Sequence, residues 1–279
     1  MNRLLLTRSI SVSVLICAMC QVVQADTSST DDGRFTIMAG AFLPAFDTNV
    51  KIDSSGQIGD KIDLDNDLGV DQDDSGFWSG FEWRIAERHR LGATYSRFTQ
   101  TGHRAIDRQI AIGDEIYPVN ATVDTTHRIE MIPITYSYSF LKRENDEVAV
   151  TVGVHWDRVS LKLAGSTSLS DDDLTAETSA DADLPLPLIG LRYDHQFAGK
   201  WSAGAGASFF SLKFGEDQLD LKGSLVNARA YTEYRLASRF GAGVAIDYFR
   251  LRIKADKSNW DGEYNYDYWG PQFYLTMHF

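Results

Sequence analysis

The chain has 279 residues, of which 43% are hydrophobic and 24% charged, and a formal net charge of −12. This acidic balance makes nucleic acid a poor partner. No segment after residue 25 approaches the ~18 consecutive apolar residues of a membrane-spanning helix. The remaining classes are therefore a secreted protein, a periplasmic protein and a barrel that crosses a membrane with strands.

Residues 1–25 have the pattern of a secretory signal peptide. Arg3 and Arg8 precede an apolar run, and Val23-Gln24-Ala25 predicts cleavage after Ala25. Both cysteines leave with this segment, so residues 26–279 are expected to form one domain without a disulfide. Without the two arginines this domain has a formal charge of −14, which also argues against anionic lipid surfaces as partners.

Ten segments of the exported chain alternate apolar with small or polar residues at a strand's period of two. They cover residues 35–41, 77–85, 91–95, 132–140, 148–156, 189–197, 201–209, 226–234, 240–248 and 273–279. An even count closes an antiparallel barrel with both ends on one side. We predict an all-β, up-and-down transmembrane β-barrel of about ten strands, with 8 or 12 as alternatives. A soluble β-sandwich is less favoured, because the apolar faces are aromatic at both ends.

The connections between these segments alternate in length. Tight turns near Arg88, Glu144, Gly199 and Ser238 are expected on the periplasmic side, with longer loops on the extracellular side. Residues 47–74 hold nine acids and two lysines, and residues 165–183 hold six acids and no base. We expect both to be acidic extracellular loops. The hairpin from His89 to Leu141 has strands near twice the 9 to 11 residues of a tilted crossing and should stand above the membrane.

The C-terminal stretch Trp269-Gly270-Pro271-Gln272-Phe273-Tyr274-Leu275-Thr276-Met277-His278-Phe279 resembles the signal read by the barrel-assembly machinery. With Asp67-Leu68-Gly69-Val70-Asp71, this ending is similar to a group of uncharacterised small bacterial outer-membrane β-barrels. The resemblance implies residence in the outer membrane of a Gram-negative bacterium and gives no activity. We expect contacts with outer-membrane lipid and lipopolysaccharide, and assembly through Phe273, Leu275, Met277 and Phe279.

If the apolar faces meet lipid, their polar neighbours face the lumen. These neighbours include Glu82, Arg84, His155, Asp157, Arg192, Asp194, Arg229, Tyr231, Glu233, Asp247, Gln272 and Tyr274. An unpaired charge in a narrow tube is costly, so we favour a charge-paired plug. The alternative is a narrow channel for small solutes or ions. Barrels of this size are usually filled by side chains, whereas open porins have 16 to 18 strands.

A rim enzyme, either a protease or a lipid A-modifying hydrolase, is a further alternative. His103 and His127 are the residues that motivate it, because omptin proteases are ten-stranded barrels with catalytic Asp and His on the outer rim. The chain has no Gly-x-Ser-x-Gly and no HExxH. We therefore predict a non-enzymatic barrel whose acidic extracellular loops mediate surface interactions.

The stretch KIDLDNDLGVDQDD, residues 61–74, has some features of a calcium-binding loop. Asp63, Asp65 and Asp67 fit positions 1, 3 and 5, but Leu68 stands at position 6, where the sharp turn needs glycine. The aliphatic residues alternate with the acids, which favours a strand-like acidic arm. We expect at most weak Ca²⁺ or Mg²⁺ binding at the three aspartates, and no other cofactor.

Overall fold

The computed structural model describes residues 33–53, 58–72, 75–167, 174–197, 199–216, 219–257 and 260–279. The predicted signal peptide lies outside these residues. Within them no helix is long and apolar enough to span a membrane.

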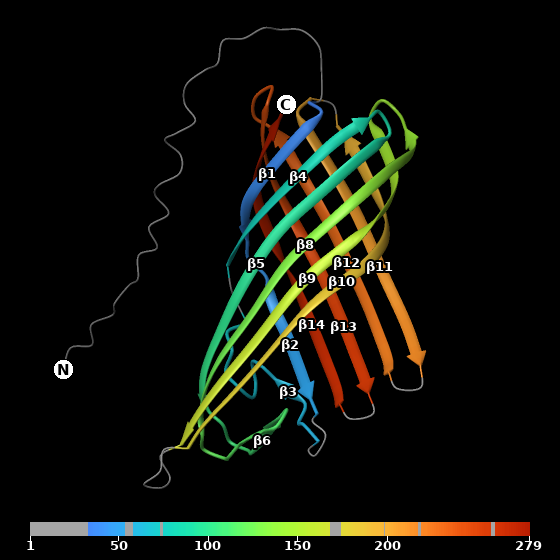
Figure 1. The fold of residues 1–279 in the computed structure, drawn as a ribbon. Helices are drawn as coiled ribbons and strands as arrows, with labels where there is room; N and C mark the ends of the chain where they lie inside the picture. The colour runs from blue at the N-terminus through green and yellow to red at the C-terminus, as the bar shows by residue number, and fades with distance from the viewer. Residues whose placement is uncertain are drawn as a thin grey trace, which may run out of the picture. The chain divides into compact units, whose positions relative to one another are not determined.

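A closed antiparallel sheet dominates the described chain (Figure 1). Its strands, in the order in which they pair, are β1 (Phe35–Phe42), β4 (Gly76–Ala86), β5 (His89–Ala105), β8 (Thr122–Lys142), β9 (Asp146–Thr167), β10 (Leu174–Gln196), β11 (Trp201–Glu216), β12 (Leu219–Arg235), β13 (Phe240–Lys257) and β14 (Trp260–His278). The pairing of β1 with β14 closes the ring. Short β2 (Ala45–Ile52) continues the line of β1 along β14. The predicted ten-stranded up-and-down barrel is confirmed.

The predicted lipid-facing positions carry exposed apolar side chains. Leu275 is 64% exposed, Phe209 60% and Ile246 59%, although each sits in a paired strand. Aromatic residues bound this apolar belt at both ends. They are Trp83, Phe197, Trp201 and Phe279 at one end, and Phe77, Trp156, Phe209 and Trp269 at the other. Such a belt with two aromatic girdles is the surface that a barrel presents to lipid.

The two ends of the barrel differ in their connections. β4–β5, β8–β9, β10–β11 and β12–β13 are joined by the predicted tight turns. The first residue of β1 and the last of β14 lie at this same end, which is uppermost in Figure 1. Short turns mark the periplasmic end of such barrels, so the opposite end is extracellular.

Several strands extend far beyond the belt at the extracellular end. β8 has 21 residues, β9 has 22 and β10 has 23, about twice a membrane crossing. The tall hairpin expected between His89 and Leu141 is confirmed. The predicted loop boundaries were wrong, because β2 (residues 45–52) extends into the first acidic loop as far as residue 52, and β9 and β10 take up most of residues 165–183. Above the membrane the outer face meets water, so these segments keep their backbone pairing without the apolar pattern of the belt.

The polarity of the two faces of the wall is exchanged where the barrel leaves the belt, while the inward and outward positions continue to alternate. On β9, Trp156 points outward and Asp157 is fully buried, whereas further up Arg158 is exposed and Val159 is buried. Along β13 the outward Ile246 is similarly followed by the outward Arg250, and the inward Asp247 by the inward Phe249. Above the membrane the interior is therefore apolar and the outer face polar, as in a soluble barrel.

The stretch KIDLDNDLGVDQDD completes the extracellular wall. The strand-like arm predicted there is mostly wrong, because only Ile62–Asp63 is a strand, β3. A turn follows, with Asp67 N bonded to Asp63 O at 2.8 Å, and it ends at Gly69, whose φ of 65° suits glycine. β3 pairs with β2, and Val70 bridges to Gly102 of β5. The segment thus fills the gap between β2 and β5 beyond the end of β4.

Candidate functional site

The barrel interior contains three successive layers between the periplasmic and the extracellular end. We call them the ionic layer, the aromatic layer and the extracellular cap. β5 illustrates their order, since Arg90 near its start belongs to the first layer and Phe98 to the second. Strand alternation places one residue in every two into this interior.

Arg90 lies at the centre of the ionic layer. Its guanidinium contacts Glu82 at 3.2 Å, Asp194 at 3.4 Å, and also Glu147. The Arg90 side chain is only 9% exposed. Three strands, β4, β9 and β10, thus supply carboxylates to one cation on β5.

Two further arginines balance these three carboxylates. Arg192 contacts Glu82 and lies 2.7 Å from Asp194, and Arg84 lies 3.1 Å from Glu147. The ionic layer therefore consists of Glu82, Arg84, Arg90, Glu147, Arg192 and Asp194, with equal numbers of each charge. The Tyr231 hydroxyl donates to Asp194 at 2.6 Å, which ties β12 to the same layer.

Two smaller polar groups accompany the ionic layer. Glu233 accepts from the Thr276 hydroxyl at 3.0 Å and lies 3.3 Å from His278. Arg229 pairs with Asp247 at 3.0 Å, and its guanidinium lies 4.9 Å from the centre of the Trp78 ring. In this part of the interior Arg229 therefore has a carboxylate partner, and Glu233 contacts a hydroxyl and an imidazole nitrogen.

The aromatic layer lies above these ion pairs. It consists of Phe42, Phe46, Phe98, Phe249, Tyr266 and Tyr268. Phe98 and Phe249 are at most 1% exposed, and the Phe249 and Tyr268 rings stack at 5.1 Å. His155 packs its ring 5.0 Å from Phe249 and lies 2.6 Å from Asp157. Rings from β1, β2, β5, β13 and β14 thus meet inside the barrel.

The extracellular cap closes the interior above the aromatic layer. Its core is aliphatic apart from Tyr117 and consists of Val50, Ile62, Leu64, Leu68, Val70, Ile106, Ile110, Ile112, Tyr117, Ala121, Val123, Leu161 and Leu163. Ile110 and Ile112 come from the small hairpin of β6 (Ile110–Ile112) and β7 (Glu115–Tyr117). All four aliphatic residues of KIDLDNDLGV after Lys61 are at most 3% exposed, since the turn points them inward.

The two histidines of the predicted rim site lie in different environments. His103 contacts Asp124 at 2.6 Å, with both side chains about two-thirds exposed. His127 is 0% exposed inside the barrel, and its ring nitrogens contact Gln100 and the Tyr264 hydroxyl, each at 3.0 Å. Burial lowers the pKa of His127 to about 4, because the charged form loses its hydration.

Each of the three aspartates of the predicted metal site has a hydrogen-bond or ion-pair partner, and Asp65 accepts from the side-chain amide of Gln72. Asp63 accepts from the backbone and side-chain amides of Asn66, and Asp67 pairs with Arg108 at 2.9 Å. Among the described residues, no three His, Cys, Asp or Glu side chains form a group able to hold a metal ion. Weak divalent-ion binding there stays a prediction.

The predicted lumen residues, including Gln272 and Tyr274, all lie on the inward faces of their strands. Sequence reasoning missed Arg90 and Glu147, because the predicted strands began one residue after each of them. It also missed the aromatic layer. The signal for Arg90 was present in the sequence, because Arg90, Gly92 and Thr94 are alternate residues of β5 and share its inward face.

Comparison with solved structures identifies the fold type. The outer membrane protease OmpT from Escherichia coli matches with a TM-score of 0.54 at 12% identity, covering 91% of this chain and 99% of that one. The translocator domain of the autotransporter NalP from Neisseria meningitidis matches with a TM-score of 0.48 at 11% identity, covering 91% and 90%. OprG from Pseudomonas aeruginosa matches with a TM-score of 0.38 at 10% identity, covering 88% and 97%.

The chain has an outer-membrane β-barrel fold. No family model matches it, and no curated protein matches it either. At 12% identity the likeness to OmpT concerns the fold alone. The apolar belt of this closed barrel gives the predicted outer-membrane location its physical basis, because only helices and closed barrels satisfy their backbone within lipid.

Proposed function

We propose that this protein is a non-enzymatic outer-membrane barrel with a closed lumen, which displays an acidic extracellular surface for a cationic partner. The observation that carries the closed lumen is the burial of the aromatic layer, in which Phe249 and Tyr266 are 0% exposed. Ion pairs lie below this layer and an aliphatic core lies above it. A hydrated ion would have to disrupt all three layers to pass.

Conductance of the refolded protein in planar bilayers tests the closed lumen. We expect no current above that of protein-free bilayers, with heat-modifiable gel migration as proof that the barrel is folded. A steady current whose ion selectivity changes in Arg192→Ala or Arg229→Ala would contradict the closed lumen and support the narrow channel instead.

The acidic extracellular surface supports the second part of the proposal. We call Asp71, Asp107, Asp114, Glu115 and Asp124 the acidic rim, since all five are exposed and lie beyond the belt. The bases of this end are partly neutralised, because Arg108 pairs with Asp67 and Lys61 lies 3.6 Å from Glu263. A cationic peptide or polypeptide is the partner whose charge complements this surface.

Binding of poly-lysine to the barrel in nanodiscs tests the acidic rim. We expect salt-sensitive binding that weakens in a variant with Asp71→Asn and Asp114→Asn. Glu87→Gln with Glu144→Gln is the matched control, because it removes two exposed carboxylates from periplasmic turns. Equal weakening in both variants would mean that only the net charge matters and would remove the rim from the proposal.

The absence of an enzymatic role has its own test. His103 and Asp124 form a surface pair on the outer face of β5 and β8, apart from the buried His127. We expect lipid A from outer membranes and added cationic peptides to be unchanged by the protein, as read by mass spectrometry. Modification of either that disappears in His103→Ala would establish a rim enzyme.

A further inference from the structure

Three large apolar side chains are exposed at the extracellular end of the barrel, beyond the belt. Ile58 is 81% exposed, Ile116 48% and Val119 44%. Ile116 and Val119 lie in the connection between β5 and β8, at the end opposite to the periplasmic turns (Figure 1). Thr122, which begins β8 directly after this connection, precedes Ile132 at the extracellular edge of the belt by ten positions, or about 33 Å along the tilted strand. We call Ile58, Ile116 and Val119 the apolar tip.

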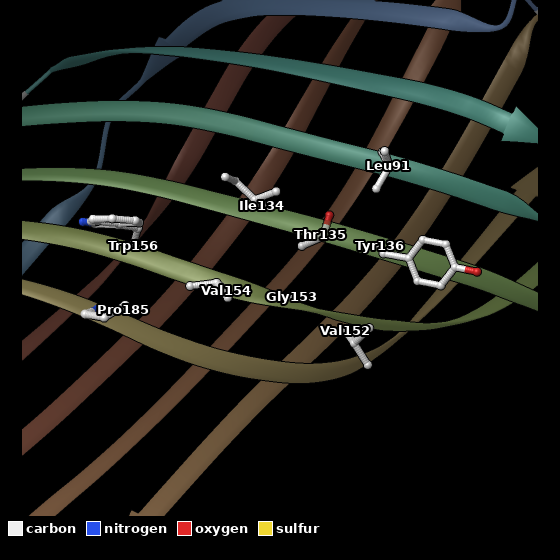
Figure 2. Close-up of a pocket in the computed structure, with 9 residues that line it drawn as sticks. All are labelled: Leu91, Ile134, Thr135, Tyr136, Val152, Gly153, Val154, Trp156 and Pro185. Carbon is white, nitrogen blue, oxygen red and sulfur yellow. The ribbon is translucent and has the colours of Figure 1, made fainter.

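The apolar tip differs from the exposed apolar residues of the belt in what surrounds it. Ile134 and Val154, which lie on the part of the wall drawn in Figure 2, are exposed in the belt and therefore meet lipid. The apolar tip meets water instead. Exposed apolar patches in water that are rimmed by polar residues mark interaction sites.

The β6–β7 hairpin gives the apolar tip a rigid support. Ile110 and Ile112 on its inner face are at most 1% exposed, and the Tyr117 hydroxyl donates to the Thr178 hydroxyl at 3.0 Å. Ile116 precedes Tyr117 on β7, so strand alternation places its side chain on the opposite, outer face. The inner face thus anchors the hairpin while the outer face presents Ile116.

Ile58 is tied to the same hairpin. Asp60, two residues after Ile58, donates from its backbone N to Ala111 O at 2.8 Å, and its carboxylate accepts from Ala111 N at 2.8 Å. Ala111 is the cross-strand partner of Ile116. A partner that contacts the apolar tip therefore meets segments that are already joined, and little conformational freedom is lost on binding.

Carboxylates outnumber bases in the segments that carry the apolar tip. Residues 58–72 and 104–121 together contain eight acids and three bases, and the bases are Lys61, Arg104 and Arg108. Arg108 pairs with Asp67 at 2.9 Å. Even when each of the three bases neutralises one acid, five carboxylates of these segments remain in excess. The apolar tip is therefore rimmed by negative charge.

We propose that the apolar tip and the acidic rim together form a docking surface for a cationic amphipathic peptide. The inference rests on the proposed function and adds an apolar contact to it. Apolar side chains of the peptide cover Ile58 and Ile116, while its lysines or arginines meet Asp114 and the other acids of the rim. A second copy of this chain is a poor occupant, because its own tip carries the same excess of negative charge.

Two synthetic peptides of equal charge test the apolar contact. One alternates lysine and leucine with amphipathic spacing, and the other has serine in place of every leucine. Each is titrated into the barrel in phosphatidylcholine nanodiscs, and binding to empty nanodiscs is subtracted because amphipathic peptides also bind lipid. We expect the lysine–leucine peptide to bind about tenfold more tightly than the lysine–serine peptide, and both to bind less tightly as the salt concentration rises.

Substitutions at the apolar tip locate the contact. Ile58→Ser and Ile116→Ser should each weaken binding of the lysine–leucine peptide about fivefold or more, since less apolar surface is buried, and should leave the lysine–serine peptide unaffected. Leu236→Ser is the matched control, because Leu236 is 54% exposed, against 48% for Ile116, and lies in a periplasmic turn. We expect the control to bind both peptides as the wild type does. Heat-modifiable migration confirms that each variant is folded.

The outcomes separate this inference from the proposed function. Equal affinity for the two peptides, unchanged binding in both isoleucine variants, or an equal loss in Leu236→Ser would each overturn the docking surface and leave the acidic rim in place. Asp71→Asn with Asp114→Asn should weaken both peptides by a similar factor, because it removes charge from the rim. If this variant weakens neither peptide, the acidic rim fails, and the docking surface fails with it.

Discussion

Phe35 and Phe279 hydrogen-bond to each other in both directions, with N···O distances of 3.2 and 2.8 Å. This pair is the periplasmic end of the seam between β1 and β14, where the two ends of the sheet meet. An unclosed seam would leave backbone groups unsatisfied in lipid, at a cost of several kcal/mol for each group.

Deleting Phe279 should therefore reduce the yield of heat-modifiable barrel in the outer membrane. Phe279→Ala is the informative companion, because it retains the backbone pair and removes only the aromatic ring. If the ring serves as the assembly signal, both variants lose yield; if the seam matters most, the substitution assembles normally. A normal yield from the deletion would contradict both roles.

Replacing Arg90 by methionine should strongly destabilise the barrel. The change leaves Glu82, Glu147 and Asp194 with two arginines instead of three, and removing one partner of buried ion pairs typically costs about 3–5 kcal/mol. The urea dependence of heat-modifiable migration measures the loss. Arg97→Ala is the control, since Arg97 makes an exposed pair with Glu130 at 3.5 Å and should cost under about 1 kcal/mol.

Replacing Gly102 by alanine should displace the segment that completes the extracellular wall. A Cβ at this position would lie 2.7 Å from Leu68 O and 2.9 Å from Val70 N, both backbone atoms. We expect residues 61–72 to become sensitive to protease in intact outer membranes, with a cost of about 1–3 kcal/mol. Gly223→Ala is the control, because its nearest neighbour, Phe210 Cε1, is 3.8 Å away. Equal protease resistance in both variants would show that the wall tolerates the displacement.

His127 should make the stability of the extracellular half depend on pH. Its pKa is lowered to about 4 in the folded state, against about 6.5 in an unfolded chain, because it is buried as the neutral form. Its contribution is fully present above pH 6.5 and is lost as the pH falls toward 4, since the unfolded state then binds the proton more readily. The loss amounts to about 3 kcal/mol. His127→Gln should show a shallower fall in unfolding free energy between pH 7 and 4.5, and an unchanged slope would contradict the assignment.

The sequence by itself determined the part of the barrel that contacts lipid, the apolar belt. The belt needs apolar side chains at every second position, so Phe273, Leu275 and Phe279, and their counterparts on nine other strands, were readable from period alone. The sequence also predicted that the charged lumen residues would form ion pairs, because unpaired charges such as Arg192 and Asp194 are costly in a narrow tube.

Only the tertiary structure decided the extracellular half. There the inward positions are apolar and the outward positions charged. An apolar residue in an alternating segment therefore faces lipid within the belt but the interior above it, and no local signal marks where the change occurs. Phe98 and Arg97 illustrate this, because their faces depend on where the lipid belt ends. The burial of Leu64 and Leu68 depends on β2, β8, β9 and the β6–β7 hairpin, which come together only when the ring closes. Contacts between segments far apart in the chain, such as Val70 with Gly102 and His127 with Tyr264, are fixed by that closure.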